Sequence, residues 1–234
     1  MVTLTIDGKL INVEPETPLI EAARKLGINI PTLCHHEALK PYGACRLCVV
    51  EVINNKWSRL VTSCNYPAEE GLEVLTASDR VKRTRRMLLE FFLARSPNVP
   101  QIRQMATKMG VKTSRFKKQE DERCILCGLC VRVCEEMVGV SAISFSNRGT
   151  EREVNTPFGV ESEVCIGCGG CTYVCPTGCI EMVGEFYDPG GRRLNMGDLA
   201  LDPCPSAYDC ETCELKSQFL EEMKQVVASI RQEI

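Results

Sequence analysis

Sixteen cysteines, against only two histidines, are the residues of this 234-residue chain best suited to chemistry. Thiols in such number can form disulfides, bind structural zinc or hold iron–sulfur clusters, and their spacing separates these uses. Disulfides require an oxidising compartment, and the first residues lack the basic and apolar stretches of a secretory signal. We therefore expect a cytoplasmic protein whose cysteines bind metal.

Two copies of one motif, Cys-x2-Cys-x2-Cys-x3-Cys, lie in the second half of the chain. This is the spacing of ferredoxins with two [4Fe–4S] clusters, in which the fourth cysteine of each run binds the other cluster. A zinc site needs only two cysteine pairs and no tight third cysteine. The expected ligands are Cys124, Cys127, Cys130 and Cys175 for one cluster, and Cys165, Cys168, Cys171 and Cys134 for the other.

The first half of the chain holds a different set, with one close pair and two outlying cysteines. Such a set suits a [2Fe–2S] cluster, which takes two thiolates on each iron, and the small Gly43 and Ala44 suit a loop folded over it. The first gap is longer than in plant-type ferredoxins, so zinc stays an alternative, less favoured beside two [4Fe–4S] motifs. The expected ligands are Cys34, Cys45, Cys48 and Cys64.

Four further cysteines would complete one more ligand set. A third [4Fe–4S] cluster is the favoured interpretation, because intracellular cysteines in such a run seldom lack a metal role. A zinc site, free thiols and ligands shared with a partner remain open alternatives. These residues are Cys179, Cys204, Cys210 and Cys213.

The surrounding sequence predicts an α+β protein. A hairpin near the N-terminus, a helix capped by Thr17 and further strands indicate a β-grasp [2Fe–2S] domain. Ser78 is expected to cap a helix that opens a basic linker. The predicted order is a β-grasp domain over 1–78, a basic helical linker over 79–118, a ferredoxin-like domain with two [4Fe–4S] clusters over 119–184, and an extension over 185–234 ending in an amphipathic helix.

Charge is segregated along the chain. Residues 80–118 hold 12 basic residues and one acidic residue, a net +11, whereas the whole chain carries −3. We expect this basic segment to face an acidic surface of the chain itself, a partner subunit or a ferredoxin, through residues such as Arg83, Arg85 and Arg86. It has too few interleaved aromatic residues to favour nucleic-acid binding, and no apolar run is long enough to span a membrane.

Residues 31–36, 42–52, 123–136, 147–149 and 157–159 together resemble one superfamily of iron–sulfur proteins. It includes the N-terminal part of the large iron–sulfur subunit of respiratory complex I, iron-only hydrogenases, NAD-dependent formate dehydrogenases and the small diaphorase subunit of NAD-linked nickel–iron hydrogenases. The resemblance implies an electron-transfer segment beside a flavin-containing, NADH-oxidising subunit. FMN and NAD(P) are then expected on that partner, and electrons pass on to a hydrogenase or dehydrogenase catalytic subunit, or to ferredoxin.

Two departures from this family shape the functional hypothesis. Most relatives carry a His-ligated cluster between the two domains, but residues 65–123 contain neither Cys nor His. No large catalytic domain follows residue 184, and no dinucleotide fingerprint is present. We therefore expect a non-catalytic electron-transfer subunit of a hydrogenase, formate dehydrogenase or bifurcating complex; the alternative is a free-standing carrier of the polyferredoxin type.

Overall fold

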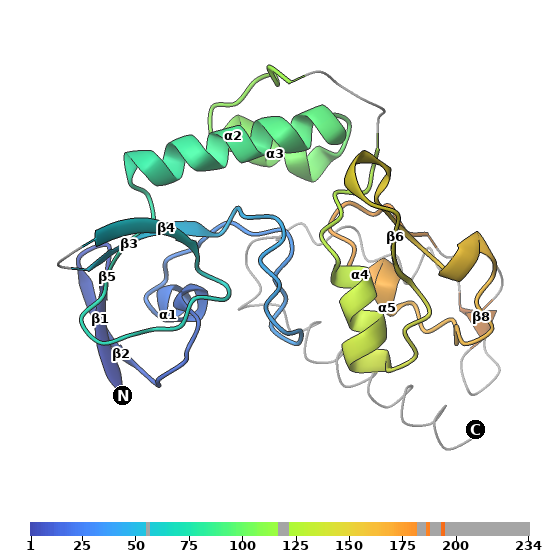
Figure 1. Ribbon diagram of the computed structural model, residues 1–234, viewed down its shortest axis with the longest axis horizontal. Coiled ribbons are helices and arrows are strands. Elements are labelled where there is room, and N and C mark those ends of the chain that lie inside the picture. Colours follow the sequence, from blue (N-terminus) through green and yellow to red (C-terminus); the bar gives the residue numbers. More distant parts are fainter. Residues whose placement is uncertain (55–56, 117–121, 182–185, 188–192, 195–234) are drawn as a thin grey trace. The chain divides into compact units, whose positions relative to one another are not determined.

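The computed structural model describes residues 1–54, 57–116, 122–181, 186–187 and 193–194 (Figure 1). The chain divides into an N-terminal unit, Met1–Cys127, and a C-terminal unit, Gly128–Ile234, and each is described by itself. The amphipathic helix expected near the C-terminus lies outside the described residues. No helix in the described ranges is long and apolar enough to cross a membrane.

The N-terminal unit is built on a five-stranded mixed sheet with the order β2-β1-β5-β3-β4. β1 pairs in parallel with β5, and all other pairs are antiparallel. The strands are β1 (Val2–Ile6), β2 (Lys9–Val13), β3 (Val49–Asn54), β4 (Trp57–Thr62) and β5 (Glu73–Leu75). This is the expected β-grasp arrangement.

The β1–β2 hairpin turns on Asp7 and Gly8, whose φ angles are 45° and 79°. Two successive residues with positive φ define the tight turn that matches the twist of paired strands, and Asp-Gly is a favoured pair for it. The register then places Ile6 opposite Lys9 and Val2 opposite Val13. The local sequence therefore fixes the first hairpin.

Helices cover both faces of this sheet. α1 (Leu19–Lys25) packs on the face that carries Val50 and Val52, and these residues share one buried core. Glu51 lies between them on the other face and contacts the start of α2 (Asp79–Arg95). Because side chains alternate across a strand, burial of successive β3 residues means that both faces are covered.

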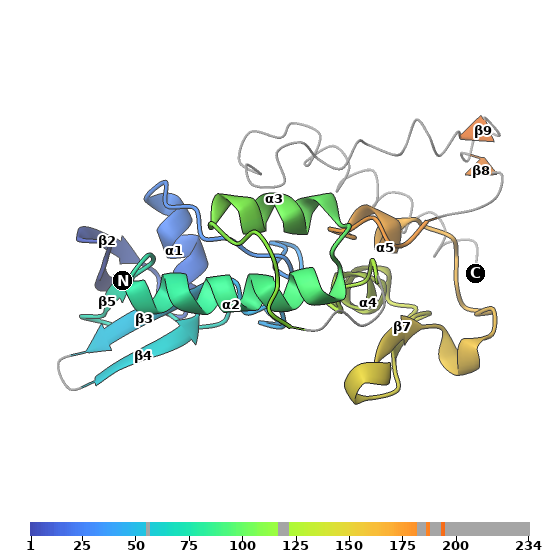
Figure 2. The ribbon, with the colours of Figure 1, turned by 90° about the horizontal axis from the view of Figure 1, so that it is seen from above.

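α2 is followed by α3 (Pro100–Lys108), and Figure 2 shows the two helices side by side. α2 begins at the expected residue, since the Ser78 hydroxyl accepts a hydrogen bond from the Val81 N–H at 3.3 Å. Such a cap satisfies one of the free N–H groups of a helix start. Val81 and Leu89 are fully buried, so this helix is anchored to the unit rather than a loose linker.

The C-terminal unit is formed by short elements. α4 (Leu129–Arg132) continues into a π-helical turn, η1 (Val133–Val138), and α5 (Gly170–Tyr173) contacts both. β6 (Ser144–Ser146) pairs with β7 (Glu153–Asn155). Two 3-10 turns, η2 (Gly149–Glu151) and η3 (Pro157–Gly159), and the strand pair β8 (Phe186–Tyr187) and β9 (Arg193–Leu194) complete the described elements.

Glu51 ties the sheet to the start of α2 through a buried carboxylate. The residue is 7% exposed, and its side chain accepts hydrogen bonds from Ser58 Oγ at 2.5 Å, Ser78 Oγ at 2.5 Å and Arg80 Nη1 at 2.6 Å. These donors, Ser58 first and Ser78 second, hold the pKa of Glu51 below its ordinary value. The ionised form is therefore the one that the fold stabilises.

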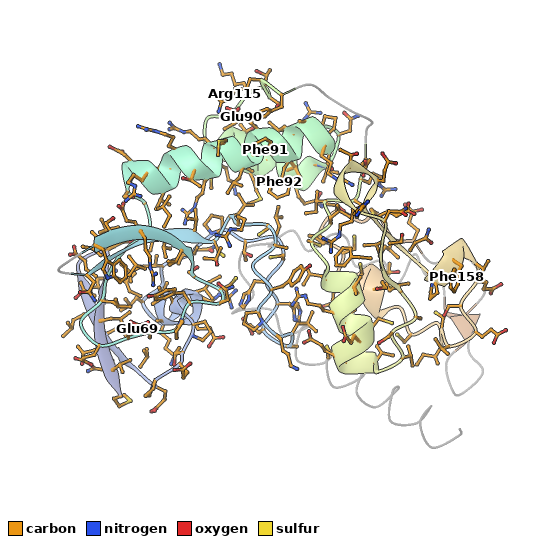
Figure 3. All side chains as sticks on the ribbon, viewed as in Figure 1. Glu69, Glu90, Phe91, Phe92, Arg115 and Phe158 are labelled. Carbon is orange, nitrogen blue, oxygen red and sulfur yellow. The ribbon has the colours of Figure 1, made fainter. Side chains whose placement is uncertain are left out.

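We expect Glu51→Gln to lower the free energy of unfolding at neutral pH by about 1–3 kcal/mol, because the neutral amide loses charge-assisted hydrogen bonds. The pKa of Glu51 is lower in the folded state, so this stabilisation is complete above the unfolded pKa and is lost as pH falls through the folded pKa. Urea unfolding at several pH values should show the gap to wild type narrowing below about pH 4.3. Glu69→Gln, at an exposed site (Figure 3), is the control. If the difference in free energy of unfolding between wild type and Glu51→Gln does not change with pH, the ionised carboxylate does not have this role.

Candidate iron–sulfur sites

Four buried cysteines lie in the N-terminal unit on the loops next to the sheet. Cys34 follows α1, Cys45 and Cys48 precede β3, and Cys64 follows β4. Their exposed fractions are 0%, 5%, 0% and 0%, in that order. Cys48 and Cys64 belong to the same hydrophobic core as α1, so the sheet itself fixes their positions.

Two hydrogen-bonded pairs organise these four thiols. Cys34 bonds to Cys45, and this bond is the largest cause that raises the pKa of Cys34 and lowers that of Cys45. Cys64 bonds to Cys48 in the same way, with the pKa of Cys64 raised and that of Cys48 lowered. Each pair thus places two sulfurs side by side, which matches the two thiolates that each iron of a [2Fe–2S] cluster takes.

The loop that carries Cys45 also directs backbone N–H groups at sulfur. The Cys45 N–H donates to Cys34 Sγ at 3.3 Å, and the Leu33 N–H donates to Cys45 Sγ at 3.4 Å. Gly43 has φ +70°, and a Cβ there would lie 3.1 Å from Asn65 Nδ2. A glycine therefore suits this close turn, and hydrogen bonds to sulfur are one means by which proteins set cluster potentials.

Within the described ranges, no three His, Cys, Asp or Glu side chains form a group that could hold a single metal ion. A structural zinc site needs four ligands around one ion. A cluster distributes its ligands, two thiolates on each iron of [2Fe–2S] and one on each iron of [4Fe–4S], so it does not need such a group. The buried, paired thiols of the N-terminal unit fit a [2Fe–2S] cluster.

The first ferredoxin-type motif begins within the N-terminal unit. Cys127 is buried and Cys124 is half-buried, with the Leu126 N–H donating to Cys124 Sγ at 3.5 Å. Arg95, the last residue of α2, donates its Nε to the Cys124 carbonyl at 2.8 Å and forms an ion pair with Glu122. The end of α2 therefore holds the first cysteine of the motif.

The C-terminal unit contains the other six motif cysteines. In this unit Cys134, the fourth cysteine of the first run, lies near cysteines of the second run. Burial raises the pKa of Cys168 and of Cys171, and the nearby Cys134 adds to both shifts. Cys134 also accepts a hydrogen bond from the Ala142 N–H at 3.2 Å. Its place beside Cys168 and Cys171 is the one that crosswise ligation requires. The remaining motif cysteines of this unit are Cys130, Cys165 and Cys175.

Cys175 is surrounded by donors, one of them from the region of the extra cysteines. The Cys179 N–H donates to Cys175 Sγ at 3.3 Å, and Thr177 Oγ1 lies 3.6 Å from the same sulfur. Hydrogen bonds from the Cys179 side chain and then from Thr177 lower the pKa of Cys175 to about 4, against the opposing effect of burial. Cys179 is thus next to a predicted cluster ligand. The other extra cysteines, Cys204, Cys210 and Cys213, lie outside the described residues.

Several side chains of the basic segment are used inside the N-terminal unit. Arg80 pairs with Glu51 at 2.6 Å, and Arg115 pairs with Glu90 at 2.7 Å (Figure 3). Arg85, named above as a candidate docking residue, is not available to a partner, because its side chain is buried and the residue is only 7% exposed. The chain's own acidic groups therefore meet part of the basic segment.

Arg85 lies near Cys48, one of the four cysteines of the N-terminal unit, and the sequence did not predict this position. It stands four residues after Val81 and four before Leu89, on the stripe of α2 that packs inward. An arginine at the spacing of an apolar stripe is the signal that could have found it. Its guanidinium reaches the loop of Cys48 through the carbonyls of Leu47 and Val49.

Two family models match the chain. Residues 1–79 match the 2Fe-2S iron-sulfur cluster binding domain, and residues 118–182 match the 4Fe-4S dicluster domain. The chain therefore contains one [2Fe–2S] domain followed by a domain for two [4Fe–4S] clusters. The expected fold class and the two expected cluster types are confirmed.

Curated relatives match a large part of this chain. The NADPH-Fe(3+) oxidoreductase subunit alpha of Geobacter sulfurreducens is 36% identical over 202 residues, covering 76% of this chain and 24% of the relative. An NADH-quinone oxidoreductase subunit of Rhizobium meliloti is 32% identical and covers 94% and 28%. The NADP-reducing hydrogenase subunit HndD of Solidesulfovibrio fructosivorans is 32% identical and covers 77% and 36%. The chain thus spans between 24% and 36% of the length of these relatives.

A solved structure is similar over most of its own length. The crystal structure of an NAD+-reducing [NiFe]-hydrogenase in the H2-reduced state contains a chain that is 33% identical, with a TM-score of 0.58. The similarity covers 66% of the present chain and 74% of the hydrogenase chain. Together with the two matched domains, it shows that this chain belongs to the superfamily of iron–sulfur subunits shared by NADH-quinone oxidoreductases and NAD(P)-linked hydrogenases.

Proposed function

We propose that this chain is the iron–sulfur electron-transfer subunit of a cytoplasmic, multi-subunit NAD(P)-linked oxidoreductase. It would pass single electrons between a flavoprotein subunit and a catalytic subunit or ferredoxin. The observation that carries this function is the pairing of four buried thiols in the N-terminal unit, in the same chain as a dicluster motif. Its relatives are subunits of NAD(P)-linked hydrogenases and oxidoreductases, which supports the same role.

The ligands in this proposal are the twelve motif cysteines. Cys34, Cys45, Cys48 and Cys64 would hold the [2Fe–2S] cluster, and the two interleaved sets of the ferredoxin-type motifs would hold the [4Fe–4S] clusters. Iron–sulfur clusters supply reversible one-electron chemistry. The chain's own part is to bury the thiolates from water and to present N–H donors to sulfur, as Leu33 and Ala142 do.

The partners follow from what the sequence does not carry. It has no dinucleotide fingerprint, so the hydride chemistry of NAD(P)H and FMN is assigned to a flavin-containing, NADH-oxidising subunit. The other partner is a hydrogenase or dehydrogenase catalytic subunit, or ferredoxin in a bifurcating complex. A free-standing carrier of the polyferredoxin type is the alternative. It would need no stable partner.

Anaerobic purification of the tagged chain from its native host tests this function. We expect it to elute with a flavin-containing protein, and NADH should reduce the clusters in that complex but not in the isolated chain. The three clusters of the twelve motif cysteines should by themselves contribute roughly 10 iron and 10 sulfide per chain. Migration alone near 26 kDa, with full cluster content and no flavoprotein, would favour the free carrier. Absence of iron would reject both functions.

The four extra cysteines extend this proposal to a third [4Fe–4S] cluster on Cys179, Cys204, Cys210 and Cys213. We expect both iron and sulfide to rise to roughly 14 per chain, and Cys210→Ser to remove about four iron while leaving the [2Fe–2S] paramagnetic signal intact. Roughly 10 iron with one zinc would indicate a structural zinc site instead. Roughly 10 iron without zinc would leave four thiols and contradict both metal sites.

A further inference from the structure

Arg85 is a buried cation in the middle of α2. Its residue is 7% exposed, and the neighbours on the same stripe of the helix, Val81 and Leu89, are fully buried. Lysine and arginine are seldom buried unless they are paired, because removing a charge from water is costly. The positive charge of Arg85 therefore needs nearby groups that offset the cost of its burial.

The guanidinium of Arg85 binds the backbone on both sides of Cys48. Its Nε donates to the Leu47 carbonyl at 3.0 Å, and its Nη2 donates to the Val49 carbonyl at 2.7 Å. The rigid fork of a guanidinium fixes two acceptors at once, which a single ammonium group does not do. Residues 47–49, which carry one of the four buried thiols, are thus clamped to α2.

Two carbonyl oxygens accept hydrogen bonds from Arg85, but they do not neutralise its charge. No carboxylate in the described part of the chain forms an ion pair with it. Burial lowers the pKa of Arg85 to about 10, and the nearby Cys48 and then Asp7 oppose that shift. The Asp7 carboxylate is already bound by the backbone N–H of Thr76 at 2.8 Å and by its hydroxyl at 2.5 Å. The two hydrogen bonds to carbonyl oxygens therefore place the charge of Arg85 at the loop that carries Cys48.

A [2Fe–2S] cluster on this loop would be the missing anion. Two ferric ions, two sulfides and four thiolates sum to a net charge of two minus, and one-electron reduction makes it three minus. A nearby buried cation stabilises both forms, and it stabilises the reduced form more, because the Coulomb energy grows with the charge. In a site shielded from water, salt does not screen this effect away.

We propose that Arg85 is a positioning residue of the [2Fe–2S] centre, which clamps residues 47–49 through two carbonyls and raises the reduction potential of the cluster by its buried charge. This role rests on the proposed ligand set Cys34, Cys45, Cys48 and Cys64. Arg85 touches neither the sulfurs nor a substrate, so it acts through the loop and through its field. The same inward-facing side chain excludes it from the partner surface of the basic segment.

Three variants of the full chain separate the charge from the clamp. Arg85→Lys keeps a charge, Arg85→Gln keeps a donor without a charge, and Arg85→Met keeps only apolar volume. The matched control is Arg83→Gln, which removes the same charge from an exposed position on the same helix. Each protein is purified anaerobically, assayed for iron and sulfide, and titrated at controlled potentials while the paramagnetic signal of the reduced [2Fe–2S] cluster is recorded.

We expect the two neutral variants to shift the midpoint potential to more negative values, and Arg85→Lys and Arg83→Gln to stay close to wild type. At a fixed ambient potential, the ratio of reduced to oxidised cluster in Arg85→Gln should fall by on the order of tenfold, which corresponds to about 59 mV for a one-electron couple. The neutral variants could also fail to assemble the [2Fe–2S] cluster and lose about two iron, while Arg85→Lys keeps it. That result would show that the site needs the cation.

Three results would overturn this role. They are a wild-type potential in a neutral variant that holds the cluster, an equal shift of the potential in Arg83→Gln, and an equal shift of the potential in Arg85→Lys. Loss of the cluster in Arg85→Lys as well as in the neutral variants would show that the two-carbonyl clamp, which an ammonium group does not replace, is required. Failure of the proposed function has a different signature, because wild-type protein would then lack the [2Fe–2S] signal altogether. Arg85→Met and Arg85→Gln both remove the charge, but only glutamine keeps a hydrogen-bond donor. If Arg85→Met unfolds and Arg85→Gln does not, the defect of Arg85→Met is one of folding, and the potential of Arg85→Gln still reports the electrostatic effect.

Discussion

Replacing Cys134 with alanine is expected to remove one whole [4Fe–4S] cluster, about four iron atoms, although the first run keeps three of its four cysteines. The reason is the position of Cys134 in the C-terminal unit, where it lies close enough to Cys168 and Cys171 of the second run to add to the rise in their pKa values. Iron and sulfide assays on anaerobically purified protein measure the loss. The control is Glu135→Gln, at the exposed neighbouring residue, which should keep all its iron.

Double variants distinguish crosswise ligation from two self-contained runs. If the fourth cysteines are exchanged, Cys124→Ala with Cys134→Ala removes both clusters, about eight iron, whereas Cys134→Ala with Cys165→Ala removes only about four. Self-contained runs give the opposite result, because Cys124 and Cys134 would then belong to one cluster. Equal losses in the two double variants would mean that the clusters assemble only together.

The second large effect is expected at Cys48, where one substitution should remove the [2Fe–2S] cluster and weaken the fold of the N-terminal unit. Cys48 is fully buried in the core and bonds to Cys64, so Cys48→Ala loses a ligand, a packed sulfur and a hydrogen bond. Because cluster binding to a folded site stabilises that fold, the unfolding midpoint should fall by more than the cavity alone explains. Thermal unfolding with an iron assay measures both losses.

Val50→Ala is the matched control for Cys48→Ala, since Val50 is equally buried in the same core and is no thiol. It should cost about 1–3 kcal/mol through lost packing and keep its [2Fe–2S] signal and iron. The two variants thus separate a packing defect from loss of the cluster. A Cys48→Ala protein that retains the paramagnetic signal would show that Cys48 is not a ligand.

Sequence spacing predicts most of the cluster chemistry because ligation is a short-range property. Three thiolates separated by two intervening residues imply a cubane wherever the motif lies, so both [4Fe–4S] runs are recognisable from residues such as Cys124 and Cys165. The cap at Ser78 is confirmed for a similar reason, since the donor is only three residues away. Thr17 shows where local reasoning fails. Its hydroxyl donates to the Glu14 carbonyl at 2.7 Å, and α1 starts at Leu19 without a side-chain cap.

The features that sequence alone misses depend on partners distant in the chain. Arg85 reads as one more charge of a basic segment until Leu47 and Val49, nearly forty residues earlier, are brought to it. Phe91 is an apolar residue of the same helix, yet it is 46% exposed, and its ring stacks on that of Phe116 with the ring centroids 4.1 Å apart. Both positions depend on tertiary packing, which no local period encodes.

The central place of β5 in the sheet sets the order in which the N-terminal unit can fold during synthesis. This strand is the last of the sheet to leave the ribosome, yet it lies between β1 and β3, pairing Ile6 with Val74 and Glu51 with Leu75. Until residues 73–75 emerge, the two hairpins lack the strand that joins them, and we expect the loops with Cys34 and Cys64 to stay open to solvent. Iron delivered earlier would meet exposed thiols on an unfinished sheet. We therefore expect the first cluster to be enclosed only after about a third of the chain has been synthesised.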